Sequence, residues 1–252
     1  MPFVPPRRAA RPLLLLCWLV PLTALSPAPP PAAAPDQRLT IRTDDGVLLA
    51  ATWYEPNARP APAVILVHML HRSRRDWDAV GSRLAAEGLG ALAIDLRGHG
   101  ESGGGASAGD PGHPDYTALV RDVAAARRYL ATRGDVQQGR VGIAGASIGA
   151  NLALLQAAGD PTVASLALLS PSLDYRGLRI ESAARKYGAR PALLVSSDDD
   201  PYATRSVHDL KSAGGGTREA LLLSQAGHGT VMLSRNGELV RTVVDWFRRT
   251  LQ

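Results

Sequence analysis

Apolar and polar positions along the chain follow two different periods. Short continuous apolar runs at 63–67 and 90–94 are typical of strands buried on both faces. Apolar residues recur every three or four positions over 77–87 and 116–133, which predicts amphipathic helices. By the same criteria, further strands are expected at 38–43, 47–53, 140–144, 165–169, 192–196 and 219–223, and further helices at 150–158, 178–187, 203–210 and 238–251. Strands that alternate with helices predict an α/β fold, with a mostly parallel central sheet flanked by helices on both faces.

The first 35 residues differ in composition from the rest of the chain. Arg7, Arg8 and Arg11 are followed by an apolar stretch over 13–25, which is shorter than the roughly 20 residues that a membrane-spanning helix needs. Residues 26–35 are mostly Pro and Ala. This order predicts a signal peptide and linker over 1–35, and therefore export to the periplasm or beyond, with no stable membrane span.

A single folded domain is expected over 36–252, and its bulk properties exclude several kinds of function. The formal net charge of +5 owes three of its charges to the N-terminal arginines, so no basic stripe for nucleic acid remains. Cys17 is the single cysteine and lies in the N-terminal segment, where a lipid anchor through it is an alternative fate. The domain is therefore expected to lack disulfides, a cysteine nucleophile and a cysteine metal site, and no metal or organic cofactor is implied.

One pentapeptide carries the main chemical signal. Gly145-Ala146-Ser147-Ile148-Gly149 has the spacing G-x-S-x-G and stands between a predicted strand and a predicted helix. A turn this tight strains the backbone of the serine and leaves no room for a Cβ at the two glycines. The strain lifts the hydroxyl out of the sheet, where a base and a substrate carbonyl can reach it, so the pattern predicts a nucleophile elbow.

Together with three other motifs, this elbow resembles the α/β-hydrolase fold family, in a compact form like that of serine esterases and lipases. The motifs are an apolar strand that ends in His68, the D-x-R-G-H-G-x-S loop over 95–102, the elbow, and a late His228 in a glycine-flanked loop. The resemblance covers the chain from about Asp36 onward. It implies a catalytic triad in the order Ser, Asp or Glu, His, and assigns Asp95 and His99 to the framework of the fold.

The triad that this resemblance implies is Ser147, Asp200 and His228. His228 follows the last predicted strand, which is where the family places its base. The acid is expected in the loop after the strand at 192–196, and the family's spacing selects Asp200. Asp198 and Asp199 are adjacent alternatives, and Asp174, after the preceding strand, is a third.

Two backbone N–H groups are expected to form the oxyanion hole. Ile148 follows the nucleophile and supplies the first, and the resemblance assigns the second to Leu70. The family usually has His-Gly at the end of the preceding strand, whereas this chain has His68-Met69. The loop 98–103 also matches G-x-G-x-x-G, but Gly, Ala and Pro follow it instead of a helix, so a dinucleotide site is not expected.

These features predict an exported serine hydrolase that cleaves small-molecule carboxylic esters through an acyl-enzyme. Only about twenty residues separate the strands at 165–169 and 192–196, so a minimal cap and a preference for short acyl groups are expected. A thioesterase or a serine aminopeptidase would use the same triad. A catalytically silent scaffold used for binding is an alternative from a different class. The sequence leaves the oligomeric state open.

Overall fold

The structure, a computed structural model, describes residues 1–3, 36–105 and 116–251. The chain divides into two units, Met1–Pro31 and Ala32–Gln252, and the fold described here is that of the second unit. The apolar stretch, the Pro/Ala linker and Cys17 of the predicted signal peptide lie outside the described residues. Within the described residues, no helix has both the length and the apolar character needed to cross a membrane.

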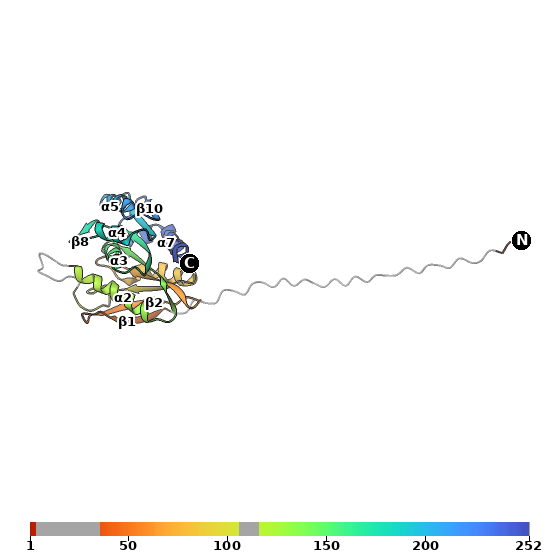
Figure 1. Ribbon diagram of the computed structural model, residues 1–252, viewed down its shortest axis with the longest axis horizontal. Helices are drawn as coiled ribbons and strands as arrows, with labels where there is room; N and C mark the ends of the chain where they lie inside the picture. Colours follow the sequence, from red (N-terminus) through yellow and green to blue (C-terminus); the bar gives the residue numbers. More distant parts are fainter. Residues whose placement is uncertain (4–35, 106–115, 252) are drawn as a thin grey trace. The chain divides into compact units, whose positions relative to one another are not determined.

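The second unit is built on an eight-stranded sheet with the order β1-β2-β4-β3-β5-β6-β9-β10. Strands β1 and β2 form an antiparallel hairpin, β2 runs antiparallel to β4, and the other neighbours are parallel. Figure 1 shows β1 and β10 at opposite sides of this unit. The strands are β1 (Gln37–Arg42), β2 (Leu48–Tyr54), β3 (Ala61–Val67), β4 (Gly90–Ile94), β5 (Val136–Ala146), β6 (Val163–Leu169), β9 (Ala192–Ser197) and β10 (Arg218–Leu223). The expected fold class, with its mostly parallel sheet, is confirmed.

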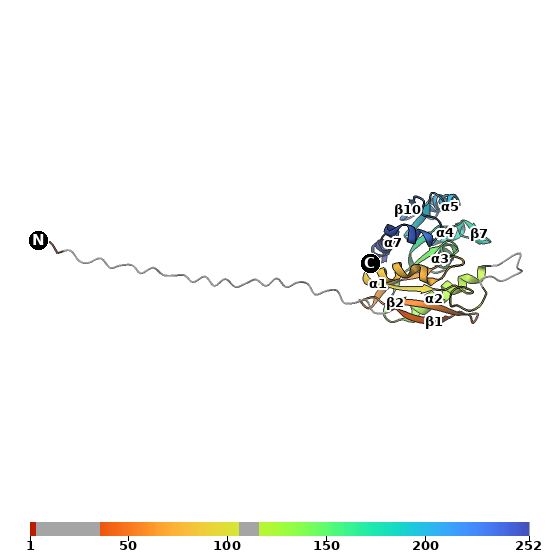
Figure 2. The same cartoon turned by 180° about the vertical axis from the view of Figure 1, so that it is seen from behind.

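Helices cover both faces of the sheet, as Figures 1 and 2 show. The first face carries α2 (Val120–Thr132), α3 (Ile148–Gly159), α4 (Glu181–Tyr187) and α5 (Pro201–Ser212). The second carries α1 (Asp78–Ala86), α6 (Val231–Arg235) and α7 (Gly237–Leu251). The short 3₁₀ helices η1 (Arg74–Trp77) and η2 (Thr117–Leu119) precede α1 and α2.

The pleat of the central strands explains why two separate cores form. On β3, the side chains of Ile65 and Val67 pack under the first face, whereas those of Val64 and Leu66 pack under the second. Successive side chains of a strand point to opposite faces, so a continuous apolar run supplies both layers at once.

The segment expected to be one helix over 178–187 is different in the structure. Leu178–Arg179 forms strand β8, which pairs with β7 (Asp174–Tyr175), and α4 begins only at Glu181. Arg176 and Gly177 close this hairpin with φ values of 48° and 89°, and Asp174 Oδ1 accepts a hydrogen bond from Gly177 N at 2.9 Å. The tight turn removes these residues from the helix, so the prediction over this stretch was wrong in its first part.

Parallel strands bring distant segments to one edge of the sheet. The carboxyl ends of β3, β5, β6, β9 and β10 lead directly into Leu70, Ser147, Ser170, Asp200 and the loop 224–230, respectively. In open parallel sheets this edge is where ligands bind.

Candidate active site

Ser147 occupies a strained turn between β5 and α3. Its backbone has φ 53° and ψ −120°, a conformation that costs on the order of 1–3 kcal/mol for a residue with a side chain. A Cβ on Gly145 would lie 2.1 Å from Gly149 O, and a Cβ on Gly149 would lie 2.4 Å from Val67 O. Both glycines are therefore required by close backbone approach, and the expected elbow geometry is present.

The side chains of Ser147, His228 and Asp200 form one hydrogen-bonded row. His228 Nε2 lies 2.7 Å from Ser147 Oγ, and His228 Nδ1 lies 2.6 Å from Asp200 Oδ2. The carboxylate accepts from Nδ1–H, which leaves Nε2 free to accept the serine proton. The Asp200 side chain is 14% exposed and that of His228 is 45% exposed. The imidazole is thus open to solvent while the carboxylate beside it is sheltered.

The three adjacent aspartates bind three different groups. Asp198 accepts from Ser224 Oγ at 2.9 Å and from Gln225 N at 2.7 Å, whereas Asp199 accepts from Gly227 N at 3.0 Å. These bonds hold the loop that carries His228, but neither carboxylate contacts the imidazole. Of the four acids considered from sequence, Asp200 is the one that the structure brings to His228.

Hydrogen bonds also explain the pKa values of the two neighbouring acids. The pKa of Asp198 is held below its usual range, chiefly by the backbone N–H of Gln225. The pKa of Asp199 is also lowered, first by the hydroxyl of Ser197 and then by Gly227 N–H. Both carboxylates therefore stay ionised, and available as acceptors for the loop, at lower pH than a free aspartate would.

Asp174, the remaining alternative, lies in the β7–β8 hairpin instead. Its side chain accepts from Gly177 N and from Arg179 Nε, each at 2.9 Å. These bonds lower its pKa, with the contact to Arg179 as the larger cause. Asp174 stabilises the turn of the hairpin and is not part of the row.

Further anchors of the histidine loop were not identified from the sequence. Ser197 Oγ accepts from Ala226 N at 2.8 Å, and Ser170 Oγ accepts from Gly229 N at 3.0 Å. Asp76, in η1, accepts a short hydrogen bond from the hydroxyl of Thr230. The last two contacts join residues 59 and 154 positions apart, so no local pattern could have indicated them.

A buried histidine orients the second expected oxyanion donor. His68 Nε2 accepts from Leu96 N–H at 2.9 Å, so Nδ1 carries the proton and donates to Met69 O at 2.7 Å. Burial lowers the pKa of His68 to about 4, which keeps the ring neutral. In a trans peptide the C=O and the following N–H point in opposite directions. The bond to Met69 O therefore turns the N–H of Leu70 away from His68.

The N–H groups of Leu70 and Ile148 have no acceptor among the described residues. Ile148 is the first residue of α3, where the N–H groups of a helix point outward and favour a negative charge. Leu70 follows β3, the strand that is hydrogen-bonded to β5, so both donors lie at the same edge of the sheet. The pair is free to receive an oxyanion.

The loop over 95–102 forms a frame beside the site. Asp95 is fully buried. Its carboxylate accepts hydrogen bonds from Arg74 N at 2.6 Å and from Glu101 N at 2.8 Å, and it forms an ion pair with the Arg74 side chain. His99 is also buried, and its Nδ1 lies 3.0 Å from Arg97 O. Neither side chain contacts the row, consistent with the framework positions that the resemblance implied.

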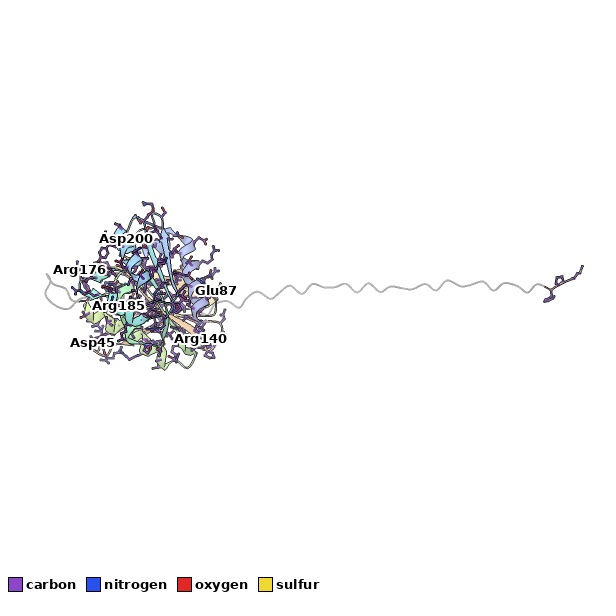
Figure 3. The ribbon with its side chains drawn as sticks, turned by 45° about the horizontal axis from the view of Figure 1, so that its top comes forward. Asp45, Glu87, Arg140, Arg176, Arg185 and Asp200 are labelled. Carbon is purple, nitrogen blue, oxygen red and sulfur yellow. The ribbon has the colours of Figure 1, made fainter. Side chains whose placement is uncertain are left out.

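The segment between β6 and β9 is compact and is bound to the start of α3. Asn151, four residues after Ser147, donates to Ser172 O at 2.7 Å and to Leu178 O at 2.9 Å. Arg176 lies at the tip of the hairpin, and Figure 3 labels it together with Asp200 at the start of α5. Every residue of this segment is described, and it contains the β7–β8 hairpin and α4 without an inserted domain.

Comparison with known proteins identifies the family. A family profile described as serine aminopeptidase, S33, matches residues 58–203, which is more than half of the chain. The chain belongs to this family of α/β hydrolases. The S33 match includes Leu70, Ser147 and Asp200 and ends before His228.

One curated relative and two solved structures illustrate the range of similarity. An uncharacterized protein of Mycobacterium tuberculosis (strain ATCC 25618 / H37Rv) is 32% identical over 135 residues, or 53% of this chain and 44% of the relative. The chain thus spans less than half the length of the curated relatives it matches. An esterase of Pyrococcus furiosus (19% identity, TM-score 0.69, covering 86% of this chain and 92% of the esterase) shares the fold. So does a dienelactone hydrolase of Anabaena variabilis (20% identity, TM-score 0.70, covering 86% and 99%).

Among the described residues, no group of three or more His, Cys, Asp or Glu side chains is placed to hold a metal ion.

Proposed function

We propose that the protein is an exported serine hydrolase that cleaves carboxylic esters of small molecules. Ser147 is the nucleophile, His228 the general base and acid, and Asp200 the group that orients the imidazole and stabilises its cation. The N–H groups of Leu70 and Ile148 are the oxyanion donors. One observation carries the proposal, namely the unbroken row Asp200–His228–Ser147 beside two unpaired N–H groups.

The first half of the reaction follows from the distances. His228 Nε2, 2.7 Å from Ser147 Oγ, takes the hydroxyl proton as Oγ attacks the acyl carbon. The negative charge that develops on the carbonyl oxygen lies between the N–H groups of Leu70 and Ile148. Each such donor contributes a factor of about 10²–10³ to kcat in serine hydrolases.

The second half regenerates the enzyme. The C–O bond to the alcohol breaks, and the leaving alkoxide takes the proton from His228 Nε2. Water then enters, gives a proton to the same nitrogen and attacks the acyl-enzyme. The acid is released as the proton returns to Ser147.

Labelling with a fluorophosphonate tests the nucleophile. Wild-type protein should react stoichiometrically, with the label on the peptide that contains Ser147, and should hydrolyse p-nitrophenyl acetate. Ser147→Ala should abolish both activities with an unchanged or slightly higher melting temperature, because the strained turn loses only one oxygen atom. Stoichiometric labelling of the Ala variant would exclude Ser147 as the nucleophile.

Amide cleavage is the second candidate, since the matching family is described as serine aminopeptidase. It would use the same row, with an amine as the leaving group. Parallel assays with p-nitrophenyl acetate and aminoacyl p-nitroanilides separate the two. A higher kcat/KM on the anilides would favour the aminopeptidase.

Export is proposed from the order of the first 35 residues. Arginines, a short apolar stretch and a Pro/Ala linker precede the folded unit, and this is the order of a secretory signal followed by a spacer. The single cysteine lies within that segment, so the folded unit would need no disulfide after export.

A further inference from the structure

Met69 lies at the site, and its side chain has no role in the reaction described above. It stands between His68 and Leu70, in the segment directly after β3. This side chain is half-buried and packs against the core under α1, α6 and α7. Methionine is flexible and polarisable, and it fills irregular apolar spaces.

The thioether of Met69 lies beside the residue that follows His228. A Cβ placed on Gly229 would be 2.6 Å from Met69 Sδ and 3.6 Å from Ser147 Cβ. The sulfur and the Cβ of the nucleophile therefore both lie near the position that a Gly229 side chain would occupy. Gly229 itself has φ 60° and is held by Ser170 Oγ, so this contact belongs to an anchored part of the loop.

The two side chains after His68 pack into opposite layers. Met69 packs against the second face, which also contains Ala226 and Met232 next to the histidine loop, whereas Leu70 packs against the first face with Leu173 of the segment after β6. Ser147 follows Ala146, which packs under the second face, and precedes Ile148, which packs under the first. Met69 is thus on the side of His228, and Leu70 is on the side of the β7–β8 hairpin.

The chemistry assigns a different part of the substrate to each side. During acylation, His228 Nε2 gives its proton to the departing oxygen as the acyl C–O bond breaks, so the alcohol portion must lie beside His228. We propose that Met69 forms the apolar wall of this leaving-group subsite and restricts the enzyme to esters of small or unbranched alcohols. This inference rests on the proposed esterase function and adds its leaving-group specificity.

Two ester series with purified wild-type and variant protein test the inference. The alcohol series consists of methyl, n-butyl and tert-butyl acetate, and the acyl series of p-nitrophenyl esters from acetate to octanoate. The quantity compared is kcat/KM, which reports acylation, and each variant is divided by wild type on the same ester. This ratio cancels the intrinsic reactivity of each alcohol. Met69→Ala widens the subsite, Met69→Phe narrows it, and Leu222→Ala, on the exposed face of β10, is the matched control.

Met69→Ala should raise kcat/KM for tert-butyl acetate relative to methyl acetate by about tenfold or more. Met69→Phe should lower kcat/KM for n-butyl acetate relative to methyl acetate by a similar factor. Neither variant should alter the shape of the acyl series, and Leu222→Ala should alter neither series. If the melting curve shows that Met69→Ala is not folded, the result for Met69→Phe alone tests the inference.

An unchanged alcohol preference in the folded variants, or a change in the acyl series instead, would overturn the proposed place of Met69. Failure of the proposed function gives a different result, because wild type would then hydrolyse no ester in either series.

Discussion

Asp200→Asn tests the row most sharply, because a second contact of Asp200 determines how the amide must be oriented. Asp200 is the N-cap of α5, and its Oδ1 accepts from Ala203 N at 3.2 Å while Oδ2 faces His228. In the Asn variant the single amide oxygen is needed at the helix N-terminus. The amide NH₂ then faces the imidazole.

This orientation reverses the tautomer of His228. An NH₂ group donates to Nδ1, so Nδ1 becomes an acceptor and the proton moves to Nε2, the atom that must accept the proton of Ser147. The variant also loses the negative charge that stabilises the imidazolium. In serine triads the loss of a correctly oriented acid lowers kcat by about 10³–10⁴. At about 1.4 kcal/mol per tenfold change, this equals roughly 4–5.5 kcal/mol of transition-state stabilisation.

Folding should be preserved, because Asn caps helices as well as Asp does. The assay is kcat for p-nitrophenyl acetate, together with the rate of fluorophosphonate labelling and the melting temperature. Asp209→Asn is a matched control, since Asp209 lies beside His208 in an exposed His–Asp contact at 3.4 Å. A loss of less than tenfold for Asp200→Asn would refute the assigned role.

Asp198→Asn and Asp199→Asn provide the comparison within the same three residues. Each keeps an oxygen that can accept from the histidine loop, and neither carboxylate contacts His228. We expect kcat to fall by less than about tenfold in both, the size of one weakened hydrogen bond. A larger loss than for Asp200→Asn would show that another aspartate is the acid.

Three further predictions concern stability, substrate size and location. The pKa of His68 is about 4 in the folded protein against 6.5 in the unfolded chain, so the unfolded state binds the proton first as pH falls. In urea unfolding, the free energy of unfolding of the wild type should therefore fall by about 3 kcal/mol between pH 6.5 and 4, and His68→Gln should lack this fall. Equal pH dependence of the unfolding free energy in the two proteins would contradict the prediction. The compact segment between β6 and β9 should limit the length of the acyl group, so kcat/KM should peak at short acyl chains, without activation at a lipid interface. A steady rise of kcat/KM to long chains would indicate a deep acyl pocket instead. Expressed with its native N-terminus in a bacterial host, the folded unit should be recovered beyond the inner membrane, and full-length protein confined to the cytosol would exclude export.

Much of the fold was predictable because its determinants are local or periodic. Apolar runs and helical periods placed the strands of the central sheet, and the alternation of the two indicated a mostly parallel arrangement. The β7–β8 hairpin was not predictable in this way. Its turn depends on two residues with positive φ and on Asn151 from another element, and its residues have no helix-breaking proline.

The sequence by itself determined the strained turn at Ser147 and the chain order of the three residues that form the hydrogen-bonded row. The requirement for glycine on either side of Ser147 arises from contacts within five residues and with one neighbouring strand, so a short motif contains it. The tertiary structure decided which aspartate meets His228, because three adjacent carboxylates differ only in the direction that each side chain takes after β9. It also decided the anchoring of the histidine loop by Ser170 and Asp76, and the place of Met69 beside Gly229. These contacts exist because parallel strands bring their carboxyl ends to one edge of the sheet, whatever their separation along the chain.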